Sequence, residues 1–413
     1  MPFGLILLLL TGLLLTGCTN ARETEDFTYI VAMGIDAAPG NKLEVTFQMP
    51  VPTSISATGG FQQEKKSITL SLIAKNIAEA RNLANSNVSR TIDHSHAKVL
   101  IIGEELARQG VGDAMAAVMR FREFRGTIFF MVAKGTAREF MEGNVPILDA
   151  QPSRYYDSMF QSAEESGYYL HADIHEFYKR LKNSLGTPYA AVGAINRTEG
   201  ADNPAKKRRG KEEADQYSAE TIPRAGSENK ATIAGTALFR GDRAFHLLTT
   251  EETRTLAMLL GQLPRGYIVV PDPLEPEKYV NLELSVRHKP RVKAKLTDGQ
   301  PSLAVSLLVE CEITSIPSGI HYSRKEYRRL LEEQISQILQ GRVQDFIQMT
   351  QELKCDPAGL GAHFRPLFAT WEEMHDADVT KLYIHAQVSS NVTVKVRRTG
   401  LMWRTAPIRR QED

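Results

Sequence analysis

The segment AKVLIIGEELARQGVGDAMAAVMRFREFRGTIFFMVAKG (97–135) decides the fold class of this chain. It starts with a continuous apolar run, AKVLIIG (97–103), and ends with a second one, TIFFMVAKG (127–135). The residues between the two runs, 104–122, follow a helical pattern. Two apolar runs joined by a helix predict a parallel βαβ unit, and their unbroken apolar character predicts a sheet that is covered on both faces.

The sequence before this unit adds strands to the same region. FTYIVAMGID (27–36) and KLEVTFQMPV (42–51) are β-branched and apolar, and the AAPGN between them predicts a hairpin turn. KSITLSLIA (66–74) predicts a further strand, and Asn76 is placed to cap the helix that follows it. We therefore expect an N-terminal mixed α/β domain over residues 18–135.

Helical patterns dominate the next region. They run from about residue 149 to 183, and PYAAVGAI (188–195) closes the region as a strand. We expect a middle helical domain or subdomain over residues 136–196. It is rich in aromatic residues, which form one candidate contact surface: Tyr155, Tyr156, Phe160, Tyr168, Tyr169, Phe177 and Tyr178.

A polar segment over residues 197–230 follows. It has almost no aliphatic residues and carries charges of both signs, so it cannot bury enough apolar area to offset the entropy of ordering it. We expect a flexible linker or loop that marks a domain boundary. Its KKRRGK run (206–211) fits either a solvated loop or a contact with anionic lipid head groups.

The remainder, residues 231–413, predicts a C-terminal α+β domain, and its strand edges are the second candidate contact surface. Strict alternation of apolar and polar residues indicates antiparallel strands with one buried and one wet face, and it places Cys311 on the buried face. The charged stripe Arg287, Lys289, Arg291, Lys293 and Lys295 fits either that wet face or a binding patch. The predicted strands are 231–240 and 244–249, which form a hairpin, and 281–288, 291–296, 302–313 and 391–400.

A long amphipathic helix lies between the last two of these strands. From Ser323 to Leu353, apolar residues recur every three or four positions, which predicts one continuous apolar stripe. Ser323 and Glu326 have the spacing of a capping box, so we expect the helix to start there. The stripe is long enough to pack across the whole C-terminal sheet.

The start of the chain has the pattern of a signal peptide. LILLLLTGLLL has the length of a signal-peptide core and is too short to span a bilayer, so we expect residues 1–17 to be a lipoprotein signal peptide. Leu15, Thr16 and Gly17 match a lipobox, and Cys18 follows as the site of lipid attachment through a thioether to diacylglycerol. The residues before the core, MPFG, lack the positive charge that usually precedes it. Acylation of Cys18 would anchor the chain to a membrane without a spanning helix.

Composition limits the remaining possibilities. The chain has 413 residues, 42% hydrophobic and 24% charged, which suits two or three domains. Its 50 basic and 49 acidic residues give a net charge of +1, so charge gives no reason to expect nucleic acid as a partner.

Residues that suggest catalysis or metal binding are few. Familiar nucleophile, phosphate-binding, zinc and calcium motifs do not occur in the sequence, and no cofactor is expected. In DHSH, Asp93, His94 and His96 have the spacing of metal ligands on a strand, but a third ligand is not identified and a structural role is favoured, so no metal site is predicted. Cys311 and Cys355 have the number needed for a disulfide, although a buried free thiol is favoured for Cys311.

Several blocks together resemble the Ger(x)C lipoproteins, the C subunits of nutrient germinant receptors in endospore-forming bacteria. They are the lipobox, VAMGID, HAKVLIIGEELARQG, RFREFRG, GTALFRGDRAFHLLTTEETR, the long helix and the closing RRTG. The resemblance covers nearly the whole chain in order. It implies a three-domain α+β fold without catalytic residues or cofactors.

The resemblance also implies a location and partners. The protein would be lipid-anchored through Cys18 to the outer face of the cytoplasmic (spore inner) membrane, beside the integral-membrane A and B subunits of the receptor. It would serve spore germination in response to a nutrient. Two other classes stay open: a solute-binding lipoprotein of a transporter, which would show two similar lobes, and a cell-envelope hydrolase, which would need a catalytic cleft.

Overall fold

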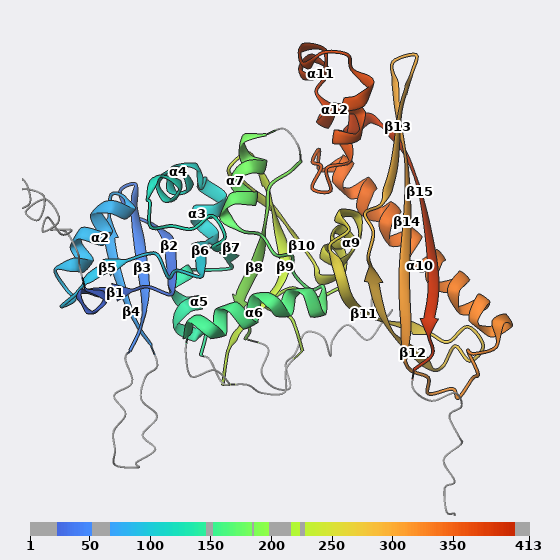
Figure 1. The fold of residues 1–413 in the computed structure, drawn as a ribbon, viewed down its shortest axis with the longest axis horizontal. Helices are drawn as coiled ribbons and strands as arrows, with labels where there is room; N and C mark the ends of the chain where they lie inside the picture. The colour runs from blue at the N-terminus through green and yellow to red at the C-terminus, as the bar shows by residue number, and fades with distance from the viewer. Residues whose placement is uncertain are drawn as a thin grey trace, which may run out of the picture.

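A computed structural model describes residues 23–51, 67–145, 152–183, 186–197, 216–223 and 228–400. Cys18, the lipobox before it and the KKRRGK run lie outside these residues. Within the described ranges, no helix has the length and apolar character needed to cross a membrane. The fold is multidomain α+β, with two main sheets set side by side along the long axis (Figure 1).

The larger sheet has eight strands. β2, β6, β7 and β8 run parallel at its centre, and antiparallel strands flank them on both sides. The short strands β1 (Phe27–Tyr29) and β5 (Thr91–Asp93) pair separately, in parallel. In spatial order the eight strands are β10 (Arg243–Leu248), β9 (Ala231–Arg240), β8 (Tyr189–Ile195), β7 (Phe129–Ala133), β6 (Val99–Gly103), β2 (Ala32–Ala38), β3 (Lys42–Pro50) and β4 (Ser67–Ala74).

The predicted βαβ unit is present, with one difference. β6 and β7 are parallel neighbours, but two helices connect them, α3 (Glu104–Gln109) and α4 (Gly112–Arg120). The break lies at Gly110, where φ is 138°. There Asp242 accepts two hydrogen bonds, one by its carbonyl from the Val111 amide and one by its carboxylate from the Gly112 amide. The break thus depends on a turn 130 residues away, which helical periodicity cannot reveal.

Helices cover both faces of this sheet, as the continuous apolar strands predict. Apolar residues of α2, α3, α4 and α7 pack on one face, and those of α5 and α6 pack on the other. The predicted helical region thus contributes to both layers. These helices are α2 (Ile77–Asn85), capped by Asn76 as expected, α5 (Ala137–Gly143), α6 (Pro152–Ser166) and α7 (Ile174–Lys182).

The large sheet continues across the polar segment 197–230. β9 and β10 form the predicted hairpin, but β9 pairs with β8 and so extends the large sheet instead of the C-terminal one. Composition identified a segment with little apolar area to bury. It could not distinguish a linker between domains from an insertion between two neighbouring strands of one sheet.

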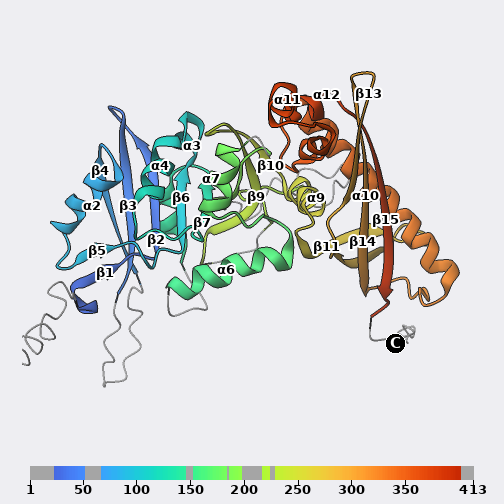
Figure 2. The same cartoon turned by 45° about the horizontal axis from the view of Figure 1, so that its top comes forward.

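The second sheet lies at the other end of the molecule (Figures 1 and 2). β12 and β13 pair with successive parts of β14 on one side, and β15 pairs with β14 on the other. The sheet is antiparallel, as predicted, except that β15 runs parallel to β14. Its strands are β11 (Leu263–Pro271), β12 (Tyr279–Val286), β13 (Arg291–Thr297), β14 (Gln300–Ser315) and β15 (Gln387–Arg398).

One long helix, α10 (Lys325–Glu352), covers one face of this sheet. The odd-numbered residues of β14, Cys311 among them, are buried on that face as predicted. The predicted capping box is wrong. The N-cap residue is Arg324, one residue after Ser323, and its side chain makes no capping hydrogen bond. The other helical elements of this part are α9 (Thr250–Leu260), η2 (Leu360–Leu367), α11 (Trp371–Ala377) and α12 (Val379–His385).

Candidate functional site

The DHSH motif has a structural role. His94 is fully buried, and its Nδ1 lies 3.1 Å from Oε2 of Glu123, which also accepts the His94 amide. Burial lowers the pKa of His94, and Glu123 opposes that shift. His96 is exposed and packs edge-on against Tyr29, so the two imidazoles do not converge. Within the described ranges, no three His, Cys, Asp or Glu side chains are arranged to hold a metal ion.

The two described cysteines do not pair. Both are buried free thiols, as favoured for Cys311. Burial raises the pKa of each thiol to about 12, and Glu332 adds to the effect at Cys311, as Asp356 does at Cys355. Both groups are therefore protonated at neutral pH and are poor nucleophiles.

The aromatic helical region is mainly core. Tyr156, Phe160, Tyr169 and Phe177 are each less than 10% exposed. Tyr156 donates its hydroxyl proton to Oε1 of Gln48 at 2.7 Å, which ties α6 to the large sheet. These side chains hold the helices in place and offer little area to a partner.

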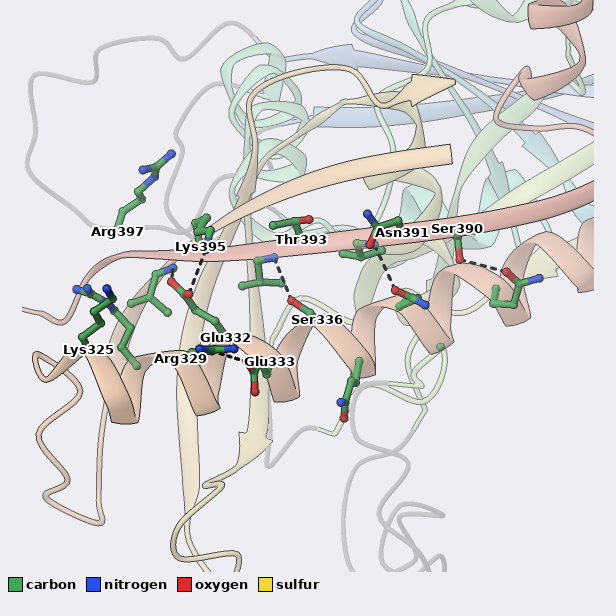
Figure 3. Close-up of a pocket in the computed structure, with 18 residues that line it drawn as sticks. Lys325, Arg329, Glu332, Glu333, Ser336, Ser390, Asn391, Thr393, Lys395 and Arg397 are labelled. Carbon is green, nitrogen blue, oxygen red and sulfur yellow. Dashed lines mark hydrogen bonds and ion pairs between the residues drawn. The ribbon is translucent and has the colours of Figure 1, made fainter. Parts of the chain in front are cut away.

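The strand edges of the C-terminal sheet were the other candidate contact surface. β15 is an edge strand, and α10 runs beside it and forms a long groove with it (Figure 3). The groove is lined by hydroxyl and amide side chains along most of its length, with charged residues at one end. Figure 3 shows Glu332 and Ser336 pointing from the helix toward the strand.

Side chains of α10 bond to the free edge of β15 as a ladder. Glu332 Oε1 accepts the Val396 amide at 2.9 Å, and Ser336 Oγ accepts the Val394 amide at 3.1 Å. One turn further, Gln340 Oε1 lies 3.5 Å from the Val392 amide. Four helical residues rise about 6 Å and two strand residues about 6.6 Å, so successive rungs stay in step.

This ladder closes the edge that β15 would otherwise present for pairing with another strand. Of the other outer strands, β11 lies beside α6 and β13 lies beside η2. The ladder is not among the features predicted from the sequence. Its signal was a line of polar residues four apart, Glu332, Ser336 and Gln340, next to the apolar stripe of the helix.

Charges at the end of the groove are largely paired. Glu332 also lies 3.4 Å from Lys395, and Glu310 pairs with Arg397 at 2.6 Å and with Arg287 at 3.3 Å. The Glu332–Lys395 pair joins α10 to β15, and the Glu310–Arg397 pair joins β14 to β15. The arrangement suits a structural role, because most of these polar groups already bond to one another.

Comparison with known proteins agrees with this description. Residues 20–195 match the family model for the spore germination protein N-terminal domain, and residues 234–400 match the model "Spore germination B3/ GerAC like, C-terminal". The two matches meet at the polar segment. They leave out only short parts of the chain.

Individual relatives are similar over nearly their whole length. Spore germination protein KC of Bacillus subtilis (strain 168) is 23% identical over 419 residues, which cover 98% of this chain and 97% of the relative. Spore germination protein B3 of the same organism is 24% identical over 359 residues, 86% of each chain.

Among solved structures, that of the GerBC protein has a similar fold, with a TM-score of 0.54 at 16% identity, covering 88% of this chain and 96% of that one. The two family matches, in order along the chain, cover its two sheets and, apart from the lipobox, the blocks on which the sequence resemblance rests. This chain therefore belongs to the Ger(x)C family of spore germination proteins.

Proposed function

We propose that this protein is a membrane-anchored, noncatalytic lipoprotein subunit of a nutrient germinant receptor required for spore germination. Cys18 carries diacylglycerol, and Leu15, Thr16 and Gly17 direct its processing. The A and B integral-membrane subunits are its partners, at the outer face of the spore inner membrane. The observation that carries the proposal is a LTGC lipobox ahead of a chain that matches both germination-protein families in order.

The geometry supports a noncatalytic role. The buried thiols are held protonated, and His94 bonds to Glu123 inside the core. The two sheets also differ in topology and in their helical cover, whereas a solute-binding lipoprotein would have two similar lobes. These features favour a receptor subunit over the two alternative classes.

The anchor would place one end of the molecule next to the bilayer. Glu23, the first described residue, follows Cys18 by five positions, which span at most about 18 Å of extended chain. The chain then enters η1 (Thr24–Asp26) and β1, at the end of the molecule opposite the C-terminal sheet (Figure 1). The N-terminal α/β region is thus the part nearest the proposed anchor.

The test is a Cys18→Ala variant produced in sporulating cells, with Thr19→Ala as the matched control. We expect Cys18→Ala to lose fatty-acid labelling, to leave the membrane fraction and to impair nutrient-triggered germination. Thr19→Ala should keep all three properties. Membrane retention together with normal germination in Cys18→Ala would refute the anchor.

A further inference from the structure

Among the described residues, no helix covers the second face of the C-terminal sheet. α10 packs on the face formed by the odd-numbered residues of β14, and the even-numbered residues point the other way. The register places three cations of β13 on this open face, each beside a small or polar residue of β14: Arg291 beside Ser306, Lys293 beside Ala304 and Lys295 beside Ser302. The next strand continues the rows with Asn391, Ser389 and Gln387.

We call Arg291, Lys293 and Lys295 the β13 stripe. All three side chains are exposed, and none makes an ion pair or hydrogen bond with any residue of the described ranges. Between Arg291 and Ser306, where β13 and β14 pair, the only acidic residue is Asp298, at the turn. Over these three rows the open face carries positive charge with no anion of its own.

The other half of the same sheet is different. There Arg287 and Arg397 both pair with Glu310, at 3.3 and 2.6 Å, and Lys395 pairs with Glu332. In this half of the sheet, the cations at the ends of β12 and β15 therefore each have a carboxylate partner. The β13 stripe is the part of the face where this does not happen, although Ser302, Ala304 and Ser306 occupy positions that acidic residues could fill.

The shape of this surface indicates what it would bind. Alternate residues of a strand are about 7 Å apart, so the three cations form an evenly spaced row along β13. Its neighbours in the register are Ser, Ala, Asn and Gln, none of them an aromatic residue of the kind that anchors most protein interfaces. A plane of anionic phosphate groups requires only distributed positive charge.

We propose that the β13 stripe binds the anionic phospholipid head groups of the membrane to which the protein is anchored. This inference rests on the proposed function, which supplies the other point of attachment, the acylated Cys18. The stripe lies at the end of the molecule opposite β1, and the β13–β14 hairpin extends to the edge of the fold (Figure 1). Acylated Cys18 holds one end, and the stripe turns the other end toward the bilayer, so that the long axis lies along the membrane.

The test uses the chain from Thr19 onward, which contains every described residue and no acyl group. Its binding to phosphatidylcholine vesicles is compared with binding to vesicles that also contain phosphatidylglycerol. Each cation near an anionic surface contributes about fivefold to partitioning, so Lys293→Glu/Lys295→Glu should weaken binding by about 30-fold or more. The matched control, Arg324→Glu/Lys325→Glu, makes the same change in net charge at exposed positions on the side of α10 and should change binding by less than about threefold.

Equal binding to neutral and anionic vesicles, or equal loss in both variants, would overturn the proposal. So would unchanged vesicle binding in Lys293→Glu/Lys295→Glu combined with lost co-purification of the receptor subunits, which would assign the stripe to an acidic protein surface. Circular dichroism of both variants checks that they are folded. In the acylated full chain the stripe variant should stay in the membrane fraction, so a failure of the stripe is distinguishable from a failure of the Cys18 anchor.

Discussion

Thr187 and Asp356 hydrogen-bond to each other twice. The Thr187 amide donates to the Asp356 carbonyl, and the Asp356 amide donates to Thr187 Oγ1, both at 2.8 Å. Thr187 lies just before β8 of the large sheet, and Asp356 follows α10, so the pair joins the two parts of the molecule. Arg180 adds a third bond across the same boundary, from Nη1 to the Pro357 carbonyl at 3.0 Å.

The carboxyl group of Asp356 makes this junction sensitive to pH. It is buried, it accepts the amides of Leu360 and Gly361, and burial raises its pKa to about 6 in spite of these bonds. The folded protein therefore holds this proton more tightly than the unfolded chain. The resulting stabilisation is complete below pH 3.8, the ordinary value for Asp, and is lost as pH rises through about 6. Its size is on the order of 3 kcal/mol.

Asp356→Asn should remove this dependence. We expect the free energy of unfolding of the natural protein, relative to the variant, to fall by on the order of 3 kcal/mol between pH 4 and pH 7. Urea denaturation across that range measures it. Asp298→Asn is the control, because Asp298 is exposed at a turn with φ of 51°, a conformation that Asn also adopts readily. Parallel curves for the natural protein and Asp356→Asn would contradict the assignment.

A second prediction concerns the ladder between α10 and β15. Ser336→Ala removes the acceptor for the Val394 amide, and the small side chain that replaces it cannot bond to the strand. We expect a loss of about 1 to 2 kcal/mol in the free energy of unfolding. The neighbouring Gln337→Ala is the control, since Gln337 is exposed and its substitution should stay within about 0.5 kcal/mol.

The same variant should expose the strand edge. An unpaired amide in the middle of β15 gives another chain a place to start pairing. Light scattering after mild heating should therefore show earlier association for Ser336→Ala than for Gln337→Ala. Equal stability and equal association in the two variants would mean that the ladder contributes nothing.

Local patterns in the sequence predicted much of the fold. Period-two alternation identified the buried face of β14, and the apolar stripe identified α10, because both depend on residues close in sequence. The break at Gly110, the partner strand of β9 and the junction at Thr187 depend on contacts between distant residues. The β13 stripe was visible as a pattern of charges. Only the register showed that its neighbours carry no opposite charge.

The last prediction compares one substitution at two glycines. Gly103 ends β6, and a Cβ added there would lie 1.9 Å from Oδ1 of Asp36. That carboxylate accepts the amides of Ala137 and Arg138, at 2.7 and 3.0 Å, and so holds the start of α5 against the sheet. Gly103→Ala must displace it, and we expect a loss of about 2 to 4 kcal/mol in the free energy of unfolding.

Gly341 provides the opposite case. It lies in the middle of α10, and a Cβ there would have no atom within 4 Å apart from its chain neighbours and the backbone of the adjacent helical turns. Alanine is the better helix former, so Gly341→Ala should add about 0.5 to 1 kcal/mol. The urea midpoints of the two variants should therefore move in opposite directions from that of the natural protein. If both urea midpoints fell, the space beside Gly341 would be smaller than the structure indicates. If both midpoints rose, the Asp36 carboxylate would not occupy the position from which it accepts the two α5 amides.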